Sequence, residues 1–116
     1  MTSKIKGRLR DAIDAFSQAH ILVIGDLIVD HFIWGSVTRI SPEAPVPVVN
    51  VTHDNLLLGG SANVLHNIFG LGAQATICGV IGHDPMGDHL LSLISALPSS
   101  TAGIVRLDDR PTTIKT

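Results

Sequence analysis

Apolar runs and amphipathic stretches alternate along the chain. Residues 20–29 form a nearly continuous apolar run, and residues 74–81 form a second one. Runs of this kind, without polar alternation, are typical of strands that are buried on both faces of a parallel sheet. We therefore predict two core strands at these positions and a third over residues 103–107.

Three segments between these runs have helical character. In residues 4–19, apolar side chains recur every three or four positions with charges between them, which predicts an amphipathic helix packed as an N-terminal extension. Ser61 is a good N-cap for a helix over residues 62–71, and Asp84 followed by a proline starts a helix that lasts until Pro98. Strands that alternate with helices indicate an α/β domain with a parallel sheet.

Prolines set the middle of the chain apart. Residues 36–47 should be extended and irregular, and residues 45–51 should form a strand at a sheet edge, because this stretch holds prolines at positions 42, 45 and 47. The valines of that strand fall on both faces: Val46 and Val48 on one, and Val49 and Val51 on the other. An edge strand with two apolar faces promotes association, so we expect self-association through this strand.

Composition removes several classes of function. The chain has 116 residues, 45% of them hydrophobic, and its mean hydropathy of +0.38 excludes general disorder. A net charge of −2 and an aromatic content of 3% argue against a nucleic-acid partner. The longest apolar stretch, residues 21–34, is too short and too charged to cross a membrane.

The N-terminal segment and the single cysteine favour a cytoplasmic protein. Four basic residues precede Asp11 and Asp14, whereas a signal peptide would continue with an apolar run. Cys78 has no partner within the chain for a disulfide, lies in an apolar run, and fits a reducing compartment.

Two short motifs can carry chemistry. Gly25 to Asp30 lies where the first predicted strand ends, at the sheet edge where ligands of open α/β sheets bind. A carboxylate there can accept hydrogen bonds from sugar hydroxyls. Gly59 and Gly60 precede a helix whose first turn holds Asn63, and this arrangement lets a ligand approach free backbone N–H groups. The structural alternatives are a turn-capping aspartate and a plain glycine turn. If both motifs bind one ligand, Asp30 and Asn63 converge on one pocket.

Other chemistry is not indicated. The chain has six histidines but no His-Glu-x-x-His spacing, so we expect no metal site. No Walker A loop follows the glycine pair, and no Ser-His-Asp arrangement can be argued from spacing.

These motifs resemble those of the ribokinase-like (PfkB-type) carbohydrate kinases. The resemblance runs from about residue 21 to residue 116 and, within the family, is strongest to the kinases of heptose 7-phosphate. The most specific block is residues 39–49, Arg-Ile-Ser-Pro-Glu-Ala-Pro-Val-Pro-Val-Val. The motifs at 25–30, 59–63 and 82–87 follow in the family order, and residues 111–116 resemble a strand of the lid region.

The resemblance implies a fold and a set of roles. The fold is a parallel sheet with helices on both faces and a small β lid, with residues 1–19 as an N-terminal helix and residues 36–58 as the lid segment. Asp30 matches the aspartate that holds sugar hydroxyls, and Gly59, Gly60 and Asn63 match the sugar-binding glycine turn. The lid covers the sugar and often pairs two subunits, which implies a homodimer. Asp84 and Gly87 also match the family, and we interpret both as residues that set the fold.

The family's reaction needs parts that these 116 residues lack. ATP with Mg²⁺ phosphorylates the anomeric hydroxyl of the sugar phosphate on the route to ADP-heptose, a lipopolysaccharide precursor. The general base and the nucleotide pocket belong to the family's later half. We therefore expect an incomplete domain with no catalytic residue of its own, and no binding of ATP by this chain alone.

Departures from the family pattern are small within the matched region. Ser61 and Leu65 stand where smaller residues are usual, and neither change removes a hydrogen-bonding group. Two alternatives stay open: a non-catalytic module that binds sugar phosphates or dimerises, and a fragment of a fructose-type or ribose-type kinase. The proline block argues against the second.

Overall fold

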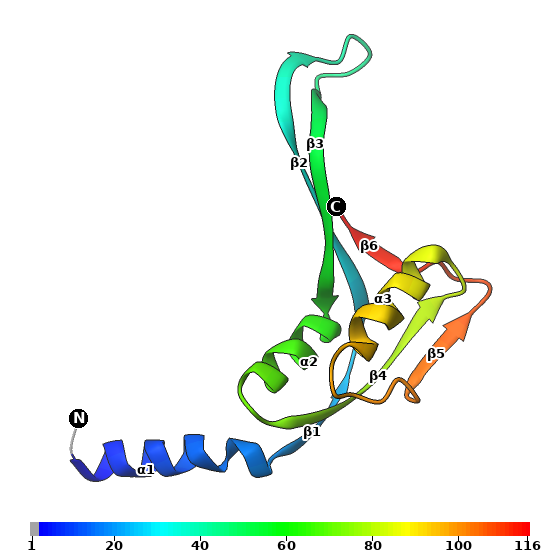
Figure 1. Cartoon of the computed structure of the whole chain (residues 1–116). Coiled ribbons are helices and arrows are strands. Elements are labelled where there is room, and N and C mark those ends of the chain that lie inside the picture. Colours follow the sequence, from blue (N-terminus) through cyan, green and yellow to red (C-terminus); the bar gives the residue numbers. More distant parts are fainter. Residues whose placement is uncertain (1–2) are drawn as a thin grey trace.

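A computed structural model describes residues 3–116. Its elements are, in order, α1 (Ser3–Asp14), a 3₁₀ helix (Ala15–Gln18), β1 (His20–Ile24), β2 (Leu27–Ile40), β3 (Pro47–Gly60), α2 (Ser61–Gly70), β4 (Gln74–Gly82), α3 (Pro85–Ser95), β5 (Ile104–Leu107) and β6 (Thr113–Lys115). Figure 1 shows a small α/β layer from which a long β-hairpin projects at one end and α1 at the other.

The α/β layer is built on a parallel sheet in the order β1-β4-β5. Val23 of β1 pairs with Ile77 of β4, and Val80 of β4 pairs with Val105 of β5, all in parallel register. The two apolar runs are therefore adjacent parallel strands, and the predicted third core strand is present. These pairings confirm the α/β fold class.

A second sheet has the order β3-β2-β6. Strands β2 and β3, of 14 residues each, form an antiparallel hairpin with register shifts after Trp34 and after Val37. Strand β6 pairs in parallel with the start of β2. Because β3 has a neighbour on one side only, the proline-containing strand is an edge strand, as predicted.

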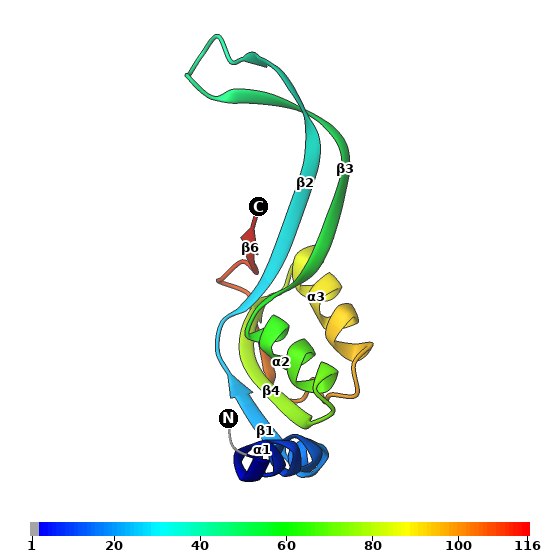
Figure 2. The same ribbon diagram turned by 90° about the vertical axis from the view of Figure 1, so that its left-hand side faces the viewer.

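The core lies between the parallel sheet and helices α2 and α3, which share one face of it (Figure 2). Its fully buried side chains are Leu27, Val29, Leu65, Ile77, Ile81, Leu90 and Ile94. On the opposite face the described residues leave Leu22 58% and Ile24 74% exposed. The described part of the chain thus provides one of the two helix layers that a complete domain of this class has.

Three expectations about element boundaries are wrong. The apolar run of residues 20–29 is not one strand, because the chain breaks at Gly25 and its second half joins the other sheet. Residues 36–40 continue β2 instead of being irregular, and β3 extends to Gly60, well beyond residue 51. Cross-strand hydrogen bonds of the hairpin outweigh the local effect of the prolines, two of which lie in the connecting loop.

Helix α1 forms as predicted but does not pack. Its apolar side chains stay exposed, between 47% and 61% for Ile5, Leu9 and Ile13, and Figure 1 shows the helix extending away from the sheet. No helix among residues 3–116 is both long and apolar enough to cross a membrane.

Candidate functional site

The break after β1 brings three segments together. The carbonyl oxygen of Asp26 accepts hydrogen bonds from both the backbone N–H and the hydroxyl of Ser61, each at 2.8 Å. Gly60 has a φ of +56°, and a Cβ at this position would collide with the same carbonyl, so only glycine fits. The end of β3 and the start of α2 are thereby fixed beside the end of β1.

Asp30 lies on β2 directly opposite Leu57, and its carboxylate rests against the backbone of β3. A Cβ built on Gly59 would lie 2.6 Å from Oδ1 of Asp30. Glycine is needed at position 59 because any side chain would displace the carboxylate. The Asp30 side chain is only 16% exposed, so its orientation is set by its surroundings.

A cation completes this cluster. The Nζ of Lys115 lies 2.7 Å from Oδ1 of Asp30, and the two residues are register partners of the parallel strands β6 and β2. The resemblance places residues 111–116 in the lid region, but no sequence signal shows that Lys115 contacts Asp30, since 85 positions separate them.

The hairpin adds aromatic side chains on the same face as Asp30. Positions 30, 32 and 34 alternate regularly along β2 and so share a face. The rings of Phe32 and Trp34 are stacked with centroids 6.3 Å apart, and the ring of His53 stacks on Trp34 at 5.6 Å. Sequence reasoning missed this ladder, because His53 joins it only through cross-strand pairing.

Asn63 lies in the first turn of α2, at the wall of a neighbouring pocket. This pocket has a volume of about 300 Å³ and is lined by Leu57, Leu58, Asn63, His66, Leu93 and Leu97. The carboxylate of Asp30 lies against Gly59. Asn63, in contrast, borders a pocket whose lining residues do not include Asp30. The convergence of Asp30 and Asn63 on one ligand stays a prediction.

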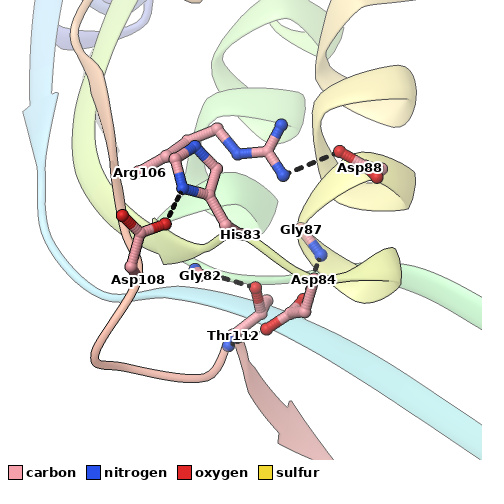
Figure 3. A network of polar contacts seen from close by, with 8 residues as sticks. All are labelled: Gly82, His83, Asp84, Gly87, Asp88, Arg106, Asp108 and Thr112. Atoms are coloured by element: carbon pink, nitrogen blue, oxygen red, sulfur yellow. Dashed lines mark hydrogen bonds and ion pairs between the residues drawn. The ribbon is translucent and has the colours of Figure 1, made fainter.

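A polar network at the end of β4 anchors the segment that leads to Lys115 (Figure 3). Asp84 caps α3 by accepting a hydrogen bond from the backbone N–H of Gly87 at 2.7 Å, and its other oxygen accepts one from the backbone N–H of Thr112 at 2.7 Å. These bonds, first that from Thr112 and then that from Gly87, lower the pKa of Asp84. The hydroxyl of Thr112 in turn accepts a hydrogen bond from the N–H of Gly82 at 3.0 Å.

Two further ion pairs lie in this region. His83 contacts Asp108, and Arg106 lies 2.8 Å from Asp88, as Figure 3 shows. Asp84 caps α3, and a Cβ at Gly87 would collide with the carbonyl oxygen of Gly82, so the predicted cap and close approach are both present. Within residues 3–116, no three His, Cys, Asp or Glu side chains are grouped so that they could hold a metal ion.

Known proteins with similar sequences share this region. The protein HldE of Helicobacter pylori strain P12, a bifunctional protein, is 49% identical over 96 residues, and HldE of Aliarcobacter butzleri strain RM4018 is 47% identical over 96 residues. These matches cover 83% of this chain but only 21% and 20% of the relatives. The chain thus spans about a fifth of the length of the curated relatives it matches.

Solved structures show the same arrangement of elements. The ATP-bound fructokinase of Xylella fastidiosa matches with a TM-score of 0.62 and 26% identity, over 82% of this chain and 28% of that one. The ADP complex of ribokinase from Cryptococcus neoformans var. grubii serotype A matches with a TM-score of 0.61 and 20% identity, over 83% and 29%. The family model of the pfkB carbohydrate kinases matches residues 18–116. Because that match spans most of the chain, the chain belongs to the pfkB family of carbohydrate kinases.

Proposed function

We propose that this chain forms the sugar-binding part of an ATP-dependent kinase that phosphorylates heptose 7-phosphate at its anomeric hydroxyl. Membership of the pfkB family supports the kinase class, and the block at residues 39–49 supports the heptose substrate by its resemblance to heptose kinases. One observation carries the proposal: Gly59 leaves room for the carboxylate of Asp30 beside the turn into α2.

Each residue of the cluster has a simple task in this proposal. The Asp30 carboxylate accepts hydrogen bonds from two neighbouring sugar hydroxyls, which a fixed and partly buried carboxylate does best. Gly59 and Gly60 keep the backbone bare so that the sugar can approach. Asn63 donates a further hydrogen bond from the first turn of α2.

The other half of the reaction is not assigned to this chain. Phosphoryl transfer needs a base for the attacking hydroxyl and Mg²⁺ on the ATP phosphates. No metal-binding group is found among residues 3–116, and no Walker A loop is present. The described residues therefore do not fit ATP-bound Mg²⁺, and we derive no step through it.

We further propose that the β2–β3 hairpin is the lid and that it pairs two subunits of a cytoplasmic enzyme. Val37 lies directly opposite Val49, and the two valines are 53% and 43% exposed. Seven positions separate Val37 from Asp30 along β2, so alternation places them on opposite faces. One face is thus free for the sugar while the other presents valines to a partner lid.

A chimera tests the substrate. In this chimera, the present chain replaces the matching N-terminal part of the Helicobacter pylori P12 relative. We expect ATP-dependent release of ADP with D-glycero-D-manno-heptose 7-phosphate and at least tenfold lower kcat/KM with ribose or fructose. Equal or better turnover of ribose or fructose contradicts the heptose assignment, and a chimera that binds heptose 7-phosphate without turnover supports the non-catalytic module.

Variants of the chimera test the site. Asp30→Ala and Gly59→Ala should each raise the KM for the sugar tenfold or more, because the first removes the carboxylate and the second displaces it, while the KM for ATP changes less than twofold. Gly70→Ala is the matched control, since a Cβ at Gly70 meets no atom within 4 Å. Equal losses for sugar and ATP would count against the assignment of Asp30.

A further inference from the structure

We propose that Lys115 recognises the phosphate group of the sugar substrate and gives the site its preference for a phosphorylated sugar. This inference rests on the proposed function, because it takes the Asp30 cluster as the sugar site. It assigns a specificity-determining role to a residue that sequence reasoning left without one.

The first argument is the position of the cation. Lys115 Nζ lies 2.7 Å from Asp30 Oδ1, and the lysine side chain is 68% exposed whereas the aspartate side chain is 16% exposed. A lysine ammonium has three N–H donors. Lys115 forms an ion pair with Asp30 but no hydrogen bond with it, so the N–H donors of this exposed ammonium stay available to a ligand.

The second argument is charge. A sugar phosphate carries a charge of about −1.5 to −2 at pH 7, and a lone carboxylate in the site would repel it. The ammonium of Lys115 balances the charge of Asp30, so that a phosphorylated sugar can approach the same carboxylate that holds its hydroxyls. A neutral sugar would need no such cation.

The third argument is that, among the described residues, Lys115 is the cation paired with Asp30. Beyond residue 10 the basic residues are Arg39, Arg106, Arg110 and Lys115. Arg106 forms an ion pair with Asp88. Arg39 lies near the far end of the hairpin, where its cross-strand neighbour is Val48. Of these cations, Lys115 is the one that forms an ion pair with Asp30.

The fourth argument is preorganisation. Thr112, three residues before Lys115, is 5% exposed and is held from two sides by Asp84 and Gly82. Strand β6 then pairs with residues 28–30 of β2. Buried hydrogen bonds and strand pairing thus fix the backbone that presents Lys115, as a specific site requires.

The experiment compares two substrates in the chimera. Lys115→Met should raise the KM for heptose 7-phosphate at least tenfold and change the KM for unphosphorylated D-glycero-D-manno-heptose less than threefold. Lys115→Arg, which retains the positive charge, should keep most of the preference for the phosphorylated sugar. Lys6→Met is the matched control, because it removes a lysine from α1, and should change neither KM. Equal changes for both sugars, or no change, overturn the proposal and leave Lys115 as a residue that orients Asp30.

A second measurement needs no variant and no turnover. Reductive methylation of the unaltered chimera, followed by mass spectrometry, reports the reactivity of Lys115. Heptose 7-phosphate should slow methylation of Lys115 at least fivefold and leave Lys6 unaffected, while unphosphorylated heptose should not protect. Absence of this protection overturns the proposal whatever the kinase assay shows, whereas protection without turnover would contradict only the proposed catalytic function.

Discussion

Single residues of this chain connect the fold to the site, and Asp84 is the clearest case. Its carboxylate accepts two backbone hydrogen bonds, from Gly87 in its own helix and from Thr112 in the segment that leads to β6. The sequence predicts the first contact, because aspartate followed by proline is a common helix start. The second contact depends on the path of the chain after β5, which local sequence does not encode.

The pH dependence of this region follows from Asp84. Its pKa is lowered in the folded protein, so the stabilisation is fully present above the unfolded value, near pH 4, and is lost as the pH falls through the folded value. Asp84→Ala should lower the opening free energy of the region around α3 and β6 by about 1 kcal/mol at pH 7. This difference should shrink as the pH falls below about 4.

Hydrogen exchange in the chimera measures this difference, with rates corrected for the intrinsic effect of pH. Asp88→Ala is the control, because it removes an exposed carboxylate of the same helix that forms a surface ion pair, a type of interaction worth about 0–1 kcal/mol. A loss for Asp84→Ala that is equally large at pH 7 and pH 3 would show that the charge of Asp84 does not contribute.

At the scale of elements, local patterns predicted which segments form strands and helices but not how far they extend. The apolar run of residues 20–29 predicts one strand, because Ile24 and Leu27 are both apolar although they belong to different sheets. Gly25 and Asp26 between them are the local signal of its division. The length of β2 and β3 comes from pairing between residues 27–40 and 47–60, which is a non-local property. The prolines correctly predicted a loop between β2 and β3, but they did not predict that it begins only after Ile40.

The same limit applies to the site. Asp30 and Gly59 were predicted from motif order and meet in the structure. Lys115 and the stacked ring of His53 could not be predicted, because strand register alone brings them to this face. A motif names the residues that a family shares, whereas partners supplied by neighbouring strands need the three-dimensional pairing.

The hairpin carries a prediction about assembly. Val49→Glu places a charge on the exposed valine face of the hairpin, which is the face that does not carry Asp30. This variant should convert a dimeric chimera into a monomer, because burying an unpaired carboxylate between two lids is costly. Light scattering during size-exclusion chromatography gives the mass. Asn50→Glu, with the same charge on the next residue and the other face, should leave the dimer intact. A monomeric parent chimera would refute the prediction.

At the scale of the whole molecule, the shape is extended. The radius of gyration is 19.3 Å, whereas a compact chain of this length has about 13 Å. The hairpin and α1 both project from the α/β layer (Figure 1). Because the exposed side chains of α1 and of the open sheet face are apolar, the described residues have more hydrophobic surface than a small stable domain tolerates.

This surface and the missing catalytic parts lead to one expectation for the 116-residue chain on its own. It should show no kinase activity and no measurable affinity for ATP, because phosphoryl transfer depends on positioned groups around the phosphates and the resemblance assigns the general base and the nucleotide pocket to the family's later half. It should also aggregate, since Leu22, Ile24 and Val105 are more than half exposed on one sheet face. The assay is ADP release from the purified chain with ATP, Mg²⁺ and heptose 7-phosphate, with the chimera as the positive control. Turnover that survives rigorous removal of host kinases would show that the catalytic machinery lies within these residues after all.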